Sequence, residues 1–189
     1  MGPLEYLLLF AAIILGLAVA DLATSLHRLL GAGARVAWDW LAPLAALVAF
    51  LKIVTLWWSW FGIDKLARGL TWEMFLGFLA GTVLLFLMAA TALPDEVPDG
   101  TIDLRAHYAA VQRRYWILFA AEWLLMNLLT VWAQVQILGA HFQALSPAYL
   151  VLPLAVSLIF VRNRWWHTAC LVGLAVIYVG QFAGHALAG

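Results

Sequence analysis

Residues 74–93 read MFLGFLAGTVLLFLMAATAL, an apolar stretch without a single charged side chain. An apolar segment of about 20 residues is long enough to cross the hydrocarbon core of a bilayer as one helix. The composition agrees, because 66% of the 189 residues are hydrophobic and only 11% are charged. Soluble domains carry about 25% charged residues, so the sequence excludes a water-soluble globular protein and predicts an integral membrane protein.

Similar apolar stretches recur and predict an all-α membrane protein, a bundle of six transmembrane helices in a single domain, 1–189. The predicted spans are Leu4–Leu26, Val36–Phe61, Trp72–Leu93, His107–Leu138, Pro147–Val161 and Trp165–Leu187. The fifth span is the shortest and contains Pro153, whose missing N–H predicts a kink. Asp103 is the predicted N-cap of the fourth helix, whose first turns are expected to project from the bilayer.

The distribution of basic residues predicts the orientation. With six spans, the first, third and fifth connections lie on one side of the membrane. These connections and their flanks carry seven arginines: Arg28, Arg35, Arg105, Arg113, Arg114, Arg162 and Arg164. The opposite side carries only Lys65 and Arg68. The positive-inside rule therefore predicts a multi-pass protein of the bacterial cytoplasmic (inner) membrane, with both termini on the extracytoplasmic side.

Four polar residues stand out within the predicted spans: Asp21, Lys52, Glu122 and Asn127. An ionisable side chain at a helix centre costs about 2.5–3.5 kcal/mol, so each needs a partner, water or a role. Helix rise predicts Lys52 and Asn127 at similar depth, within hydrogen-bonding reach, and Glu122 within reach of the lysine.

One interpretation of these four residues is a path for protons or small ions, which makes the protein a small channel or carrier. Asp21 and Glu122 would relay protons, Lys52 would tune them and Asn127 would act as a polar gate. The other interpretation is a structural Lys52–Glu122 ion pair that fixes the helix register, with Asp21 paired to an interface arginine.

The side predicted to be cytoplasmic supports a second hypothesis. Its candidate ligand-binding or lipid-binding residues are His27, Arg28, His107, Arg113 and Arg114. Together with the acidic stretch 95–103 they form a surface of both signs, typical of a binding or assembly module that recruits a protein partner or an anionic lipid. Ordinary positive-inside residues are the alternative explanation.

Two GxxxG motifs predict close helix packing, either within the chain or in a homo-oligomer. They are Gly77/Gly81 and Gly180/Gly184. Tryptophan clusters such as Trp57-Trp58 and Trp165-Trp166 are typical of interface anchors, with a lipid-binding groove as the alternative.

Other functional classes lack support. Cys170 is the single cysteine, and no nucleophile or nucleotide-binding motif is present, so no disulfide, metal site or enzymatic activity is predicted. The five histidines lie near the ends of predicted spans, where bonds to water or headgroups explain them better than haem ligation, so no cofactor is expected. The formal net charge is zero, which argues against a nucleic-acid partner.

Residues 93–116 resemble a known family. The resemblance lies in Leu93-Pro94, Asp103-Leu104-Arg105, His107-Tyr108 and Arg113-Arg114-Tyr115-Trp116. With ADLATSLHRLL (20–30) and WWSW (57–60), these residues resemble a family of uncharacterised bacterial six-helix inner-membrane proteins. The resemblance implies a bacterial inner-membrane location and a six-helix fold. No activity is attached to that family, so it implies no site residues.

Overall fold

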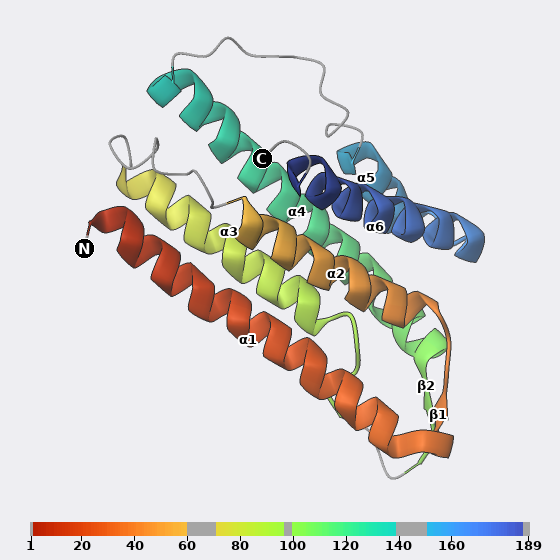
Figure 1. Cartoon of the computed structure of the whole chain (residues 1–189). Helices are drawn as coiled ribbons and strands as arrows, with labels where there is room; N and C mark the ends of the chain where they lie inside the picture. The colour runs from red at the N-terminus through yellow and green to blue at the C-terminus, as the bar shows by residue number, and fades with distance from the viewer. Residues whose placement is uncertain (1, 60–70, 97–99, 139–150, 187–189) are drawn as a thin grey trace.

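The computed structural model describes residues 2–59, 71–96, 100–138 and 151–186. The described chain is all-helical apart from one short 3-10 turn, Gly33–Arg35, and two strands of two residues each (Figure 1). Along the chain the elements are α1 (Pro3–Ala32), β1 (Val36–Ala37), α2 (Leu41–Trp58), α3 (Trp72–Ala90), β2 (Ile102–Asp103), α4 (Leu104–Leu138), α5 (Val151–Phe160) and α6 (Arg164–Ala186).

Four of the helices are long and apolar enough to cross a membrane. These candidate spans are Leu4–Arg35, Leu41–Trp58, Trp72–Ala90 and Leu104–Val135. A bilayer core needs about 20 such residues, so these helices indicate a membrane protein, as the sequence predicts.

The structure describes helix α5 over the ten residues Val151–Phe160. The start of its predicted span, 147–150, lies outside the described residues. The kink at Pro153 therefore stays a prediction.

Two helix boundaries also differ from the predicted ones. Helix α1 continues six residues beyond Leu26 and ends before Gly33, whose φ of 54° is readily adopted by glycine. The second helix begins at Leu41 rather than Val36, because Val36 and Ala37 pair in parallel with β2. This short ladder joins the connection after α1 to the one before α4.

The predicted N-cap of α4 is confirmed. The carboxylate of Asp103 accepts hydrogen bonds from the backbone N–H groups of Arg105 and Ala106, at 2.8 and 3.3 Å. These contacts satisfy two of the donors that the first turn of a helix leaves open.

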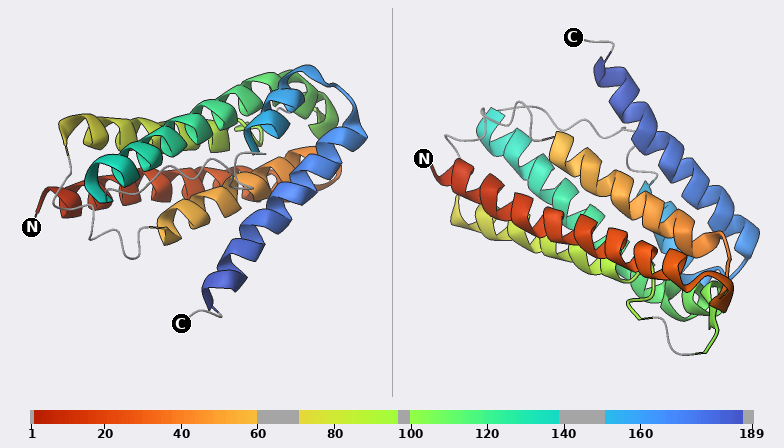
Figure 2. Two further views of the ribbon diagram at one scale, coloured as in Figure 1. Left: turned by 90° about the horizontal axis from the view of Figure 1, so that it is seen from above. Right: turned by 60° about the horizontal axis from the view of Figure 1, so that its bottom comes forward.

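The helices pack in pairs, with the most extensive contacts between α3 and α4, α1 and α3, α4 and α5, and α2 and α6. Seen from above, α1 and α2 form one layer and α3 and α4 the other, while α6 crosses beside α2 (Figure 2). A core of apolar side chains from all six helices lies between them.

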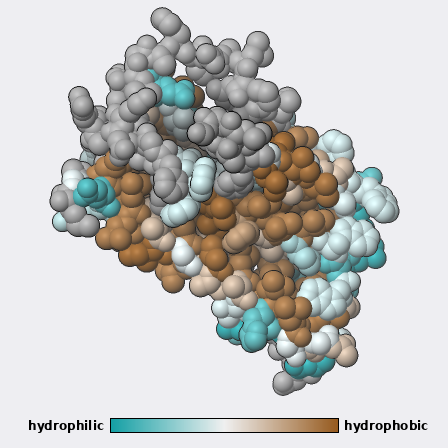
Figure 3. Space-filling model, in the orientation of Figure 1, coloured by the Kyte–Doolittle hydropathy of each residue, from teal (hydrophilic) through white to brown (hydrophobic). Residues whose placement is uncertain are grey.

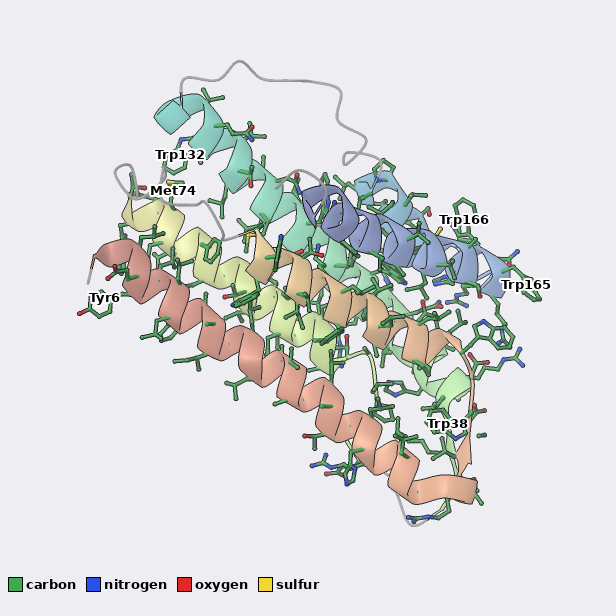
Figure 4. All side chains as sticks on the ribbon, viewed as in Figure 1. Tyr6, Trp38, Met74, Trp132, Trp165 and Trp166 are labelled. Carbon is green, nitrogen blue, oxygen red and sulfur yellow. The ribbon has the colours of Figure 1, made fainter. Side chains whose placement is uncertain are left out.

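One end of the bundle gathers three connections, and we call residues 33–40, 100–103 and 161–163 the basic end. The β1–β2 ladder joins the first two connections, and an ion pair between Asp39 and Arg164 ties the first to the start of α6. Hydrophilic side chains collect at this end beyond a broad apolar surface (Figure 3). Exposed aromatic side chains mark both ends, with Tyr6 and Trp132 at one and Trp38 and Trp165 at the other (Figure 4). Such belts are typical of membrane interfaces.

The first GxxxG motif packs within the chain. A Cβ atom built on Gly77 would lie 2.9 Å from the Leu129 side chain, and one on Gly81 would overlap Met126. Both neighbours belong to α4, so this face of α3 is occupied by a helix of the same chain. Gly180 has open space around its Cα, and of Gly184 only the backbone is described.

Candidate functional site

The most deeply buried charges belong to Lys52 of α2 and Glu122 of α4. The lysine Nζ lies 2.6 Å from the glutamate Oε2, and the two residues are only 6% and 2% exposed. The distance is that of an ion pair. Each charge offsets the desolvation of the other, which neither residue would tolerate alone.

Aromatic side chains enclose this ion pair. Nζ of Lys52 lies 4.4 Å from the ring centroid of Phe119, one turn before Glu122 on α4. The phenol of Tyr178, from α6, interacts with both charges. Three helices therefore converge on the pair, with two of the four interacting groups supplied by α4. The hydrophobic surroundings strengthen the attraction between the charges and keep their geometry fixed.

Asn127 does not join this group. Its amide donates a 2.8 Å hydrogen bond to the carbonyl of Trp123, one turn back on the same helix. The prediction of a Lys52–Asn127 hydrogen bond is therefore wrong. The physical reason is local competition, since a short amide side chain reaches the carbonyl four residues earlier more easily than a neighbouring helix.

Asp21 also lies in a different environment. Its charged neighbours among the described residues are Asp95 and Arg28, and the guanidinium of Arg28 donates to the backbone carbonyl of Asp95. The structure thus divides the four predicted path residues: it joins Lys52 to Glu122 and groups Asp21 with the polar residues near the basic end.

Of the candidate ligand-binding residues on the side predicted to be cytoplasmic, the structure brings some into one cluster and leaves others apart. His107 is half-buried, lies near the Thr91 backbone, and interacts electrostatically with Asp95 and Arg114. Its Nε2 atom has no hydrogen-bond partner among the described residues. Arg113 and Arg114 are exposed on α4, and His27 is exposed on α1. Arg28, Asp95, His107 and Arg114 therefore form one cluster of both signs.

Sequence reasoning missed a second ion pair. The Arg164 guanidinium donates to the Asp39 carboxylate at 2.5 Å and lies 4.3 Å from the Trp40 ring. The Trp40 indole N–H in turn donates to the Thr168 hydroxyl at 3.0 Å. The sequence does contain one feature that could have indicated this ion pair: Asp39 lies between two tryptophans in the short segment Trp38-Asp39-Trp40.

The prediction that His167 bonds to water or headgroups is wrong, because the side chain belongs to a buried hydrogen-bond network. It is 1% exposed, and its Nδ1 is hydrogen-bonded to the Tyr108 hydroxyl at 2.8 Å. The Trp116 indole N–H donates to the same hydroxyl at 3.2 Å, while Nε2 lies 2.8 Å from the Val161 carbonyl. Both ring nitrogens are engaged, so neither is open to a ligand.

The remaining predicted features are only partly described. His141 lies outside the described residues, and of His185 only the backbone is described. Among the described residues, no three His, Cys, Asp or Glu side chains gather as they would around a metal ion. Comparisons with family models, curated proteins and solved structures find nothing that matches this chain.

The ion pair predicts the stability of its variants. Lys52→Met or Glu122→Leu alone should destabilise the protein by about 3–5 kcal/mol, because each leaves one buried charge without its partner. The double variant Lys52→Met/Glu122→Leu should recover most of this loss, since apolar side chains of similar volume replace both charges. Thermal unfolding of the four proteins in one detergent measures the coupling. Single variants that melt with the wild type would contradict the assignment.

Proposed function

We propose that the protein is a membrane-embedded binding module that holds the headgroups of anionic phospholipids on the first turns of α4, next to the basic end. The observation that carries the proposal is the pair of adjacent arginines, Arg113 and Arg114, both exposed on α4. Neither takes part in an ion pair within the part of the chain that the structure describes. An arginine without a carboxylate partner presents its full fork of donors to a phosphate.

The length of α4 supports headgroups as the ligand. Its 35 residues extend about 52 Å, whereas a hydrocarbon core is about 30 Å thick. If the apolar part after Trp116 fills the core, Arg113 and Arg114 lie within about one turn of its boundary. This is the level of the lipid phosphates, where basic residues attract anionic lipids by about 1 kcal/mol each.

Neutral substitutions test this proposal. Arg113→Gln/Arg114→Gln should lower the preference for phosphatidylglycerol over phosphatidylcholine about thirtyfold, since two basic contacts are lost. Native mass spectrometry of the detergent-purified protein with both lipids measures the preference.

Arg113→Lys/Arg114→Lys is the matched control, because it keeps both charges and should retain most of the preference. An unchanged preference in the Gln variant would reject lipid binding at this surface. A protein that co-purifies with the wild type and is lost from the Gln variant would show instead that the surface binds a protein partner.

The same proposal includes the topology. We propose a bacterial inner-membrane protein with the basic end in the cytoplasm and both termini outside, so that α5 and α6 complete a six-span path. Support comes from the arginines that gather on this side of the chain. Alkaline phosphatase fused to the C-terminus should then be active in cells and a fluorescent-protein fusion dark. The reverse pattern would contradict the proposed orientation.

A second candidate function is proton or small-ion transport through the Lys52–Glu122 pair. It is favoured by the burial of two charges among transmembrane helices, a common feature of transport sites. Wild-type protein in liposomes should then conduct protons or small cations, and Lys52→Met/Glu122→Leu should abolish the flux while keeping the fold. Equal flux from both proteins, measured with pH-sensitive and cation-sensitive dyes, would reject the candidate.

A further inference from the structure

The carboxylate of Glu122 already has a cation beside it. Nζ of Lys52 lies 2.6 Å from its Oε2 atom, and a metal ion binds a carboxylate oxygen at about 2.0–2.6 Å. The ammonium group therefore occupies the position on this oxygen that a metal ion would take. A metal ion could bind there only by displacing the side chain of Lys52.

Burial makes a second cation at this carboxylate unfavourable. Lys52 is 6% exposed and Glu122 is 2% exposed, and the Phe119 ring centroid lies 4.4 Å from Nζ. A cation on the other carboxylate oxygen would lie only a few ångströms from the ammonium group. Two like charges repel each other more strongly in such apolar surroundings than in water. The resident lysine therefore opposes the binding of any further cation.

In the part of the chain that the structure describes, the pair's surroundings offer few ligands to a metal ion. Mg²⁺ takes about six oxygen ligands and Ca²⁺ about six to eight, and dehydrated K⁺ is held by rings of carbonyl oxygens. The groups that the structure places against the pair are the Phe119 ring and the Tyr178 phenol. The amide of Asn127, further along α4, donates to the Trp123 carbonyl instead.

A proton needs no such shell of ligands, because it stays bonded to a single nitrogen or oxygen atom. Across the 2.6 Å contact it can pass from Nζ of Lys52 to Oε2 of Glu122. One N–H bond breaks and one O–H bond forms, so that the ammonium group becomes an amine and the carboxylate becomes a carboxylic acid. Neither product is charged, and burial favours uncharged forms over charged ones. The pair can therefore hold a proton on either residue.

Of the residues that the structure describes, Tyr178 is the further titratable group that interacts with the pair. Its phenol, from α6, can donate a hydrogen bond to the carboxylate or to the amine. Helix α5 carries no titratable side chain, and Glu73, the one such residue of α3, is exposed in the first turn of that helix. Tyr178 is therefore the group through which a third helix acts on the pair.

We propose that the Lys52–Glu122 pair takes up and releases protons and excludes metal cations. The proposal rests on the second candidate function and narrows what that function carries, because the ammonium group already holds the place of a cation. Tyr178 is a positioning residue in this site, since its hydrogen bond orients the carboxyl group that receives the proton.

Infrared spectroscopy of the full chain in lipid films tests the site without relying on transport. Acidification should produce the C=O band of a buried carboxylic acid, and this band should be lost in Glu122→Gln and in Lys52→Met/Glu122→Leu. At constant pH, Na⁺, K⁺ or Mg²⁺ should leave unchanged the carboxylate bands that Glu122→Gln removes. Glu73→Gln is the matched control, because it removes an exposed carboxyl group and should keep the buried band. Melting curves show which variants fold, and if one of the two Glu122 variants does not, the other assigns the band.

Tyr178→Phe tests the positioning role. Loss of the phenol hydrogen bond should shift the C=O band of Glu122 to higher frequency. Tyr108→Phe is the matched control, because the Tyr108 hydroxyl is bonded to His167, and it should leave the band in place. A merely structural role for Tyr178 would lower the melting temperature without shifting the band, and that result would reject the positioning role.

Failure of this proposal differs from failure of the second candidate function. A Glu122 carboxylate band that moves when a metal cation is added, or the absence of any Glu122 band on acidification, would overturn the proton site. A flux of metal cations into liposomes that disappears in Lys52→Met/Glu122→Leu would overturn it as well. Liposomes that conduct neither protons nor cations would reject transport, and the infrared bands would then decide the proton site alone.

Discussion

The bundle depends on one electrostatic constraint: two charges buried among apolar helices must remain in contact. Separating Lys52 from Glu122 would leave each in a medium that solvates it poorly. The pair therefore fixes the positions of α2 and α4 along their axes far more sharply than leucine and alanine side chains do, because apolar contacts tolerate sliding and a short ion pair does not. Tyr178 extends the same constraint to α6.

A different kind of restraint holds the basic end. There the backbone ladder between β1 and β2 and the Asp39–Arg164 ion pair connect segments that are far apart in the sequence. The hydroxyl of Tyr115 adds a 2.8 Å bond to the Ala45 carbonyl, which links α4 to α2 between the two levels. Polar contacts thus join the helices at three depths, and apolar packing fills the space around them. The exposed side chains of Arg113 and Arg114, which carry the proposed lipid binding, lie outside this framework.

Much of this architecture could be predicted from the sequence, because a bilayer demands long apolar helices and such stretches are easy to recognise. Helix rise also predicts that Lys52 and Glu122 come within reach of each other, since both depths follow from counting residues. The same residue count does not predict the partner of Asn127. It gives the depth of the amide but not the nearby carbonyl of Trp123, on the same helix, to which the amide donates. It fails for Asp39 and Arg164, since only the packing of α2 against α6 brings a connection beside a helix start. The interpretation that pairs Asp21 with an interface arginine agrees with its neighbour Arg28. Its other charged neighbour, Asp95, could not be predicted, because depth alone does not show which helix faces which.

The network around His167 has a direction. The Val161 carbonyl only accepts, so the neutral imidazole carries its hydrogen on Nε2 and receives the Tyr108 hydroxyl hydrogen at Nδ1. The tyrosine oxygen in turn receives the Trp116 N–H. Every hydrogen in this chain points the same way, from α4 through α6 to the connection at 161. A second hydrogen, on Nδ1, would make the Tyr108 hydroxyl turn its own hydrogen away and give up its bond to the ring, so the network favours the uncharged imidazole.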